Sequence, residues 1–180
     1  QPPEFGQPLE VAPGIYWLRM PLPFALDHIN LWLLRDSYGW AIVDTGIGNA
    51  TTRGHWEHVF GSLFEDSFVT RLILTHHHPD HAGNADWLAQ RWGVPVMMTG
   101  GEFLSAHALH AGIGGWDRTR NLDLYAQHGV DPTMIERQRA RGNGYQKLVP
   151  SLPGTFARLV AGDTISINDQ DWRVIVVYGH

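Results

Sequence analysis

A histidine-rich motif directly after a short apolar segment is the feature that most constrains this chain. Residues 75–81 read Thr-His-His-His-Pro-Asp-His and follow the apolar run Val69–Leu74. His76 and His78 are two residues apart, so their side chains leave an extended backbone on the same side. Pro79 disfavours helical backbone at the residue before it, which favours an extended conformation at His78. The motif therefore predicts a pair of imidazoles at the point where a buried strand ends.

The remaining side chains of the motif extend this pair toward a metal site. A helix can begin at Asp80, which would place Asp80 and His81 close to the histidine pair. Neutral imidazole and carboxylate are ligands that zinc takes at about 2.0–2.2 Å. His77 points to the other side of an extended chain, so we interpret it as a supporting residue and not as a ligand. A chance surface cluster is the alternative, because 11 of the 180 residues are histidine. We favour the metal site because the motif lies inside the chain, between a buried-looking strand and an amphipathic segment.

Hydrophobic periodicity elsewhere predicts alternating strands and helices. A helix predicted over 51–64 places Trp56, Val59, Phe60 and Leu63 on one face, and a second helix is predicted over 80–92. Strands are predicted over 15–20, 28–35, 39–44, 68–75, 94–98, 158–161, 164–168 and 171–178. This alternation indicates a layered α/β domain, and the length suits a single domain over residues 1–180.

Residues of about 101–150 differ in character from the rest of the chain. Strand-like runs are missing there, and helices are predicted over 101–110, 117–128 and 132–147. His107 and His110 share one helix face, where we favour exposed or capping roles over metal ligation. The run 137–147 is locally basic, and we interpret it as a solvated helix face rather than a surface that steers an anion.

The composition of the chain limits the kinds of partner and ligand that it can bind. The net charge of −5 argues against a protein built mainly to grip nucleic acid. The absence of cysteine excludes disulfides and thiolate metal ligands. No run approaches the roughly 18 apolar residues of a membrane span. We therefore disfavour nucleic acid as a partner and expect no membrane span; a small-molecule substrate is expected only from the family resemblance described below. We expect a cytoplasmic location, with a periplasmic one as the alternative.

The motif His76-x-His78-x-Asp80-His81 resembles the signature of the metallo-β-lactamase fold hydrolases. Three further segments support this resemblance: 41–46 is similar to the family's strand ending in Asp-Thr-Gly, 28–34 to the strand before it, and 174–180 to the strand that delivers the next histidine ligand. The resemblance covers most of the chain except about 101–150. It implies an α/β fold, the N-terminal portion of a metallo-β-lactamase-like αββα sandwich, with 101–150 as a helical insertion within the domain.

The resemblance also implies a site for two zinc ions, with iron or manganese as alternative metals. His76, His78 and His180 would hold the first metal. Asp80 and His81 would belong to the second. Asp80 would also be the catalytic carboxylate that orients the bridging hydroxide or passes a proton to the leaving group.

Asp44 would be the family's structural carboxylate beneath the site, bonded to a ligand imidazole or to the motif loop. From the residues alone, a simple turn cap at Asp44 is the alternative. The family's further ligands would follow the point where this sequence stops. We therefore expect the natural chain to continue past His180, and the 180 residues alone to bind metal weakly or incompletely.

The implied activity is hydrolysis of a small ester, thioester, lactone or amide by a zinc-bound hydroxide. Within the family, glyoxalase II-like or lactonase-like enzymes are favoured over a plain β-lactamase. A phosphodiesterase or nuclease of the same fold and an iron-dependent sulfur dioxygenase are the alternatives.

Overall fold

The computed structural model describes residues 1–65, 67–113 and 118–177. The strands are β1 (Leu9–Ala12), β2 (Ile15–Pro21), β3 (His28–Asp36), β4 (Gly39–Val43), β5 (Phe68–Ile73), β6 (Val96–Thr99), β7 (Ala157–Leu159), β8 (Thr164–Ile167) and β9 (Gln170–Arg173). The helices are α1 (Ala50–Val59), the π-helical η1 (Phe60–Phe64), α2 (Pro79–Ala82), α3 (Ala85–Trp92), α4 (Gly100–Ala111), α5 (Arg118–Gln127), α6 (Pro132–Arg141) and α7 (Gly144–Leu148). The predicted ligand His180 lies outside the described residues.

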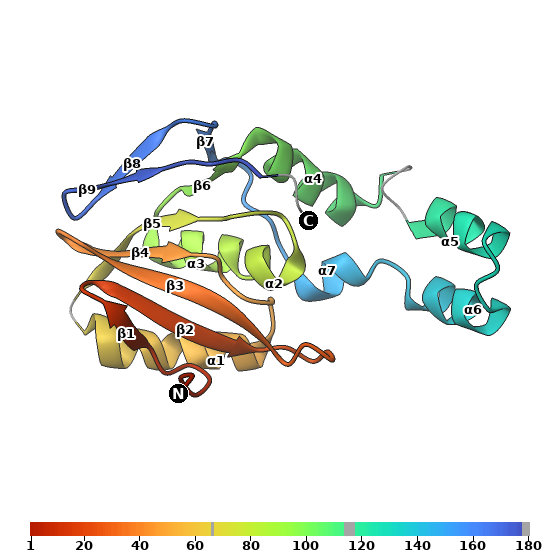
Figure 1. Ribbon diagram of the computed structural model, residues 1–180, viewed down its shortest axis with the longest axis horizontal. Coiled ribbons are helices and arrows are strands. Elements are labelled where there is room, and N and C mark those ends of the chain that lie inside the picture. The colour runs from red at the N-terminus through yellow and green to blue at the C-terminus, as the bar shows by residue number, and fades with distance from the viewer. Residues whose placement is uncertain (66, 114–117, 178–180) are drawn as a thin grey trace.

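One sheet organises the molecule, with strands β1 to β7 side by side in chain order (Figure 1). The strands from β1 to β4 pair antiparallel, whereas β4, β5, β6 and β7 run parallel to one another. Parallel strands end at the same edge of a sheet, so the chain leaves β4, β5 and β6 into loops that lie close together. The histidine motif leaves β5 at this edge.

Helices α1 and α3, with the turn η1, cover one face of the sheet (Figure 1). Asn49 begins α1, because its side chain accepts a hydrogen bond of 2.8 Å from the backbone N–H of Thr52. Trp56 and Val59 of α1 are fully buried, and Phe60 is nearly so, as the helical periodicity predicted. The main core therefore lies between this face and the helices.

The hairpin of β8 and β9 lies over part of the opposite face. Ile165 and Ile167 of β8 pack there with a sheet cluster that includes Leu34. Its two turn residues, Asn168 and Asp169, have φ of 49° and 60°, the left-handed conformation that two-residue hairpins favour. The strands predicted over 164–168 and 171–178 left residues 169–170 for this turn, one residue later than the structure has it.

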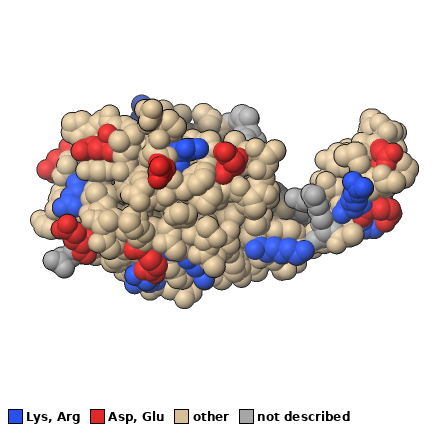
Figure 2. Space-filling model, turned by 90° about the horizontal axis from the view of Figure 1, so that it is seen from below, with Lys and Arg blue, Asp and Glu red and all other residues tan. Residues whose placement is uncertain are grey.

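The segment between β6 and β7 is helical, as predicted, and part of it stands away from the body. Helices α5 and α6 pack on each other and project as an arm (Figures 1 and 2). Leu122 and Ile135 are buried side chains of this arm. Arg137 and Arg139 of α6 are exposed, which agrees with a solvated basic face. In the described ranges, no helix is both long and apolar enough to cross a membrane.

Two predicted helices are wrong in their extent, because each is interrupted. The helix predicted over 80–92 breaks between α2 and α3 at Gly83 and Asn84. The helix predicted over 132–147 breaks at Gly142, where φ is +60°, and Asn143 starts α7 by accepting a hydrogen bond from the Tyr145 backbone N–H at 3.1 Å. The strand predicted over 171–178 begins one residue earlier and ends at Arg173. At the two helix breaks, local side-chain bonding and backbone conformation override the hydrophobic period.

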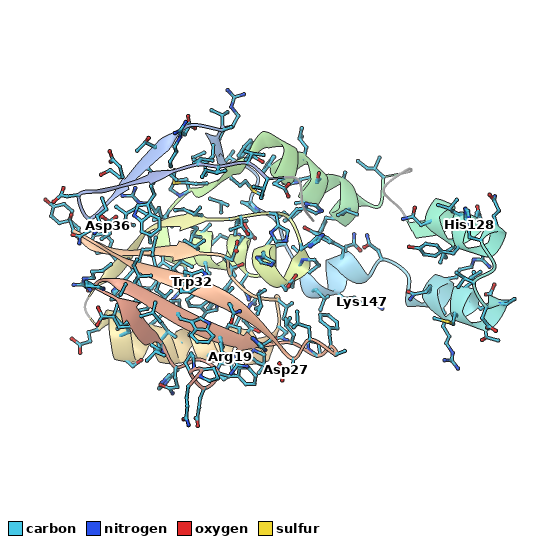
Figure 3. The ribbon with its side chains drawn as sticks, viewed as in Figure 1. Arg19, Asp27, Trp32, Asp36, His128 and Lys147 are labelled. Carbon is cyan, nitrogen blue, oxygen red and sulfur yellow. The ribbon has the colours of Figure 1, made fainter. Side chains whose placement is uncertain are left out.

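A partly buried ion pair stabilises the end of the sheet where β3 meets β4. The carboxylate of Asp36, 8 % exposed as a residue, lies 2.8 Å from the Arg71 guanidinium and accepts a hydrogen bond of 2.8 Å from the Thr70 hydroxyl. It also accepts from the backbone N–H of Asn168 at 3.1 Å, which joins the β8–β9 hairpin to β3. Figure 3 shows Asp36 at the left edge of the body, whereas Lys147 of α7 lies on the side of the body from which the arm projects. This cluster is therefore structural and remote from the motif.

Burial raises the pKa of Asp36, but its hydrogen bonds with Thr70, Asn168 and Ser37 and the Arg71 charge outweigh burial, so the net pKa is lowered. A carboxylate with a lowered folded-state pKa stabilises the fold above its unfolded pKa, and this contribution is lost as the pH falls through the folded pKa.

We predict that Asp36→Asn lowers the free energy of unfolding by about 2–3 kcal/mol at pH 7, because it leaves a partly buried guanidinium without its counter-charge. The difference from the unaltered protein should shrink below about pH 4. Denaturant unfolding at pH 7 and below about pH 4 measures the difference in the free energy of unfolding. The exposed Asp171→Asn is the matched control and should change stability by less than about 0.5 kcal/mol at either pH. A loss independent of pH would contradict the assigned role of the charge.

Candidate metal centre

The motif loop begins where β5 lies beside β4 and β6. The backbone N–H of Asp44, just past β4, donates to the Ile73 carbonyl at 2.9 Å. The backbone N–H of Leu74 donates to the Met97 carbonyl of β6, also at 2.9 Å. The two bonds carry strand-like pairing up to Leu74, so the loop from Thr75 onward starts from a fixed position on the sheet.

Asp44 connects this loop to the helix that follows it. Its carboxylate accepts hydrogen bonds from the Thr75 backbone N–H at 2.8 Å, the Thr75 hydroxyl at 2.7 Å and His81 Nδ1 at 2.8 Å. Asp44 is only 3 % exposed and has φ of +62°, a left-handed conformation that aspartate tolerates better than most residues. The structure thus places Asp44 against the imidazole of His81 and against the motif loop, the two contacts that the family resemblance implied for a structural carboxylate.

These bonds determine which nitrogen each imidazole presents. A carboxylate only accepts, so His81 Nδ1 donates to Asp44 and leaves Nε2 as the lone-pair nitrogen of the neutral ring. The Thr75 hydroxyl gives its one proton to Asp44, so His76 Nδ1, 3.0 Å from that oxygen, is the donor in their contact. His76 therefore also presents Nε2 as a lone pair. A histidine that binds a metal through Nε2 needs this tautomer.

The charge around His81 favours its protonated form. Burial lowers the pKa of His81, but the hydrogen bond and charge of Asp44, together with the charge of Asp80, outweigh burial, so the pKa is raised above its ordinary value. A metal at Nε2 must displace a proton from a raised-pKa imidazole, so its affinity should fall as the solution becomes more acidic.

The motif side chains lie close together at this edge. The ring centroids of His76 and His81 are 3.9 Å apart, and those of His76 and His78 are 4.7 Å apart. The carboxylate oxygen of Asp80 lies 3.6 Å from His81 Nε2. The donor types, neutral imidazole and carboxylate, fit zinc. Among the described side chains, however, no three are arranged as a complete metal-binding group. His76, His78, Asp80 and His81 thus form a partial donor set of suitable chemistry.

A hydroxyl and a buried amide fix the end of α2, the short helix that carries His81. The backbone N–H and the hydroxyl of Thr45 both donate to the His81 carbonyl, at 2.8 and 2.7 Å. The fully buried Asn84 donates from Nδ2 to the Ile47 carbonyl at 2.6 Å. Thr45 belongs to the Asp-Thr-Gly segment that the sequence singled out. Nothing in the sequence pointed to Asn84, whose bonding partners are nearly forty positions away along the chain.

Two glycines let three segments meet directly beneath the motif. A Cβ on Gly83 would lie 2.4 Å from the Gly48 nitrogen and 2.6 Å from the Leu148 carbonyl oxygen. Gly48 in turn donates its backbone N–H to the same Leu148 carbonyl at 2.6 Å. Only glycine permits this approach, which packs the end of α7 against the loops after β4 and α2.

The helical segment between β6 and β7 also contacts the motif. Glu102 of α4 accepts hydrogen bonds from the backbone N–H of His77 at 2.8 Å and from His77 Nδ1 at 2.6 Å. Tyr145 of α7 donates its hydroxyl to the His77 carbonyl at 2.6 Å. Neither Glu102 nor Tyr145 was predicted from the sequence. His107, by contrast, donates from Nε2 to the Pro153 carbonyl at 3.1 Å, which is a structural role.

A hollow of about 1120 Å³ runs from the motif along the second face of the sheet to the β8–β9 hairpin. One end is polar and is lined by motif and α4 side chains, Glu102 among them. The remaining walls are mostly apolar and include Trp32, Ile73 and Trp172. Figure 3 shows Trp32 on β3, in the middle of the sheet. The arrangement brings a polar, ligand-rich edge next to a broad apolar surface.

Comparison with known proteins assigns the fold to a family. Residues 25–180 match the family model described as the metallo-beta-lactamase superfamily. A beta-lactamase domain protein from Burkholderia ambifaria has a crystal structure with a TM-score of 0.82 and 41 % sequence identity, over 99 % of this chain and 51 % of that chain. A metallo-beta-lactamase family protein from Thermus thermophilus gives a TM-score of 0.70 and 28 % identity, over 92 % and 52 % of the two chains.

Two curated relatives are named as hydrolases. A hydroxyacylglutathione hydrolase from Xanthomonas axonopodis pv. citri is 34 % identical over 95 residues, which are 51 % of this chain and 36 % of that protein. The human acyl-coenzyme A thioesterase MBLAC2 is 26 % identical over 176 residues, 93 % of this chain and 56 % of that protein. The matches thus span between 36 % and 56 % of the length of these relatives, and the fold of this chain corresponds to part of their domain.

We predict that Gly83→Ala lowers the free energy of unfolding by more than about 2 kcal/mol, because the new methyl group meets backbone atoms that cannot move aside. Gly54→Ala is the matched control, since a Cβ there meets nothing within 4 Å and the position is an exposed turn of α1. It should raise stability by about 0.5–1 kcal/mol through better helix propensity. Thermal or denaturant unfolding of both variants gives the two changes in the free energy of unfolding. Equal changes in Gly83→Ala and Gly54→Ala would disprove the close packing at Gly83.

We predict that His78→Ala weakens zinc binding by at least about 100-fold, because it deletes a donor, whereas His77→Ala weakens it by no more than about tenfold. Zinc affinity measured by chelator competition distinguishes the two. Equal losses would mean that the side of the strand on which the ligands lie has been assigned wrongly.

Proposed function

The chain belongs to the metallo-beta-lactamase superfamily, and from this premise we propose that the protein is a zinc-dependent hydrolase acting on a small thioester. The observation that carries the proposal is the donor set at the carboxyl edge of the parallel strands. There the Nε2 lone pairs of His76 and His81 are set by one buried carboxylate, Asp44. Ligands of open α/β sheets bind at this edge.

The named relatives support hydrolysis, and they narrow the substrate class. One is a hydroxyacylglutathione hydrolase and another an acyl-coenzyme A thioesterase. Glutathione and coenzyme A both carry their acyl groups on sulfur, so an acyl thioester is the chemistry that the two names share. An oxygen ester, a lactone or an amide would require the same hydrolytic step on a different leaving group.

We assign roles to the motif residues within this proposal. His76, His78, Asp80 and His81 would hold zinc, together with His180 and with donors beyond the described residues. When bound, zinc lowers the pKa of a water molecule toward 7 and polarises the substrate carbonyl. Two zinc ions per complete site agree with the division of donors into a histidine pair and an Asp-His pair.

The chain's own side chains have separate tasks. Asp44 orients His81 and, through Thr75, His76, so that both rings present Nε2. The Asp80 carboxylate is partly exposed, with 24 % of its side chain accessible, and stands beside His81 Nε2. We assign it the catalytic task of holding a proton at its carboxylate and passing it to the leaving sulfur. The apolar wall that includes Ile73 and Trp32 would receive the acyl portion.

The decisive experiment is metal analysis of the full-length protein combined with turnover of a panel of substrates. We predict close to two zinc ions per chain and hydrolysis of acyl thioesters. The free thiol that the hydrolysis releases is the quantity measured. Removal of metal with a chelator should abolish turnover, and added zinc should restore it. The Asp80→Asn variant should lose turnover by about 100-fold or more.

Matched oxygen esters, lactones and amides define the substrate class, and single-stranded RNA serves as a phosphodiester control. Iron in place of zinc, with oxygen consumption, would overturn the proposal. Turnover of the phosphodiester alone would assign the protein to a nuclease instead.

A further inference from the structure

We propose that Glu102 and Tyr145, both from the helical insertion between β6 and β7, are positioning residues of the metal centre that act through His77. The inference rests on the proposed function, because it concerns how the zinc ligands are held. It assigns to the insertion a task beyond covering the site. In this proposal, the helical segment that interrupts the α/β alternation restrains the loop that carries the zinc ligands.

The contacts of His77 carry the argument. Its backbone N–H and its ring Nδ1 both donate to Oε2 of Glu102, at 2.8 and 2.6 Å, and its carbonyl accepts from the Tyr145 hydroxyl at 2.6 Å. The backbone donor, the backbone acceptor and one ring nitrogen of a single residue are thus bonded to the insertion. His77 stands between the expected ligands His76 and His78, so restraining its backbone restrains the direction of both.

The restraint matters because this stretch of the loop has left the sheet. Strand-like pairing extends as far as Leu74, and the helical bonding of α2 begins with the His78 carbonyl, which accepts from the His81 and Ala82 backbone N–H groups. His77 lies between these two supports. A charged acceptor that takes two hydrogen bonds is a strong restraint for such a position.

The two positioning residues are themselves held in place. Thr99 caps α4 by accepting from the Glu102 backbone N–H at 3.4 Å, which fixes Glu102 in the first turn of that helix. Tyr145 is 7 % exposed and packs in a small core with Ala106 of α4 and Val149. The end of α7 is fixed further by the Gly48 N–H bond to the Leu148 carbonyl. Both residues therefore approach His77 from rigid elements, as a positioning role requires.

The chemistry distinguishes this role from ligation. The Oε2 atom of Glu102 already accepts two hydrogen bonds, and Tyr145 directs its proton to a carbonyl. Partners that orient metal ligands commonly change metal affinity by about 10–100-fold when removed. Here the effect is transmitted through the backbone, so it should alter the ligand geometry as well as the affinity.

The test compares Tyr145→Phe, Glu102→Ala and Glu102→Gln in the full-length protein. Tyr145→Phe removes a single hydroxyl, and Glu102→Gln keeps an acceptor oxygen without the charge. The matched controls are Tyr125→Phe and Glu136→Gln, exposed residues of the arm. Three quantities are measured for each protein: zinc affinity by competition with a chromophoric chelator, the visible absorption spectrum of the cobalt-substituted protein, and thermal unfolding of the metal-free protein.

We expect zinc affinity to fall about tenfold in Tyr145→Phe and about 10–100-fold in Glu102→Ala, with a changed cobalt spectrum in both. Glu102→Gln should recover part of the loss, and the controls should match the unaltered protein. The double variant Tyr145→Phe with Glu102→Ala should lose less than the sum of the two on a logarithmic scale, because both act through His77.

The inference is overturned if the unaltered protein binds zinc and both Tyr145→Phe and Glu102→Ala keep its zinc affinity within about twofold and its cobalt spectrum. A change in their thermal stability alone would not support the inference. That result would leave the proposed hydrolase intact and reduce the network to a structural contact. Failure of the unaltered protein itself to bind zinc or cobalt would overturn the proposed function and this inference together.

Discussion

The buried carboxylate of Asp44 is the constraint on which the rest of this edge depends. It is almost inaccessible to solvent, so its charge is tolerated only because three donors reach it, two from Thr75 and one from His81. Those donors belong to the loop after β5 and to α2, while Asp44 itself follows β4. One group therefore joins two adjacent strand ends to the helix that carries the last motif histidine. Moving any of the three would leave a buried negative charge short of a donor, so the elements must keep their relative positions.

Backbone contacts hold the same elements from below. Gly48 and Gly83 approach so closely that a side chain on either would meet backbone atoms, and the carbonyl of Leu148 occupies the remaining space. The Thr45 and His81 bonds close the gap between the Asp-Thr-Gly turn and α2. Polar bonding thus sets the direction of the ligand side chains, while glycine packing sets the distance between the loops. The aromatic and aliphatic core under α1 and α3 provides the rigid base on which both depend.

The features predicted from the sequence were those that depend on neighbouring residues. The strand before the motif and the amphipathic face of α1 follow from local period and local composition, whereas the approach of Asp44 to the motif was implied by the family resemblance and not by its neighbours in sequence. The breaks at Gly83 and Gly142 were missed because the hydrophobic pattern runs through both, whereas Asn143 and the glycine contacts decide the backbone there. Glu102, Tyr145 and Asn84 were missed for a different reason. Their partners are between 25 and 68 positions away, so no local pattern records the pairing.

Topology explains why the helical segment between β6 and β7 can reach the motif at all. In a parallel arrangement every crossover starts at the carboxyl edge of its strand, so whatever follows β6 begins next to the loop that follows β5. Glu102 is the third residue after β6 ends at Thr99, and its contact with His77 is therefore a consequence of where α4 must start. The insertion can then lengthen into the α5–α6 arm without disturbing the sheet, provided that it returns through α7 to the Gly48 and Tyr145 contacts. The length and sequence of the α5–α6 arm can therefore change while the start of α4 and the helix α7 keep their contacts. Only these two ends of the segment hold the motif loop.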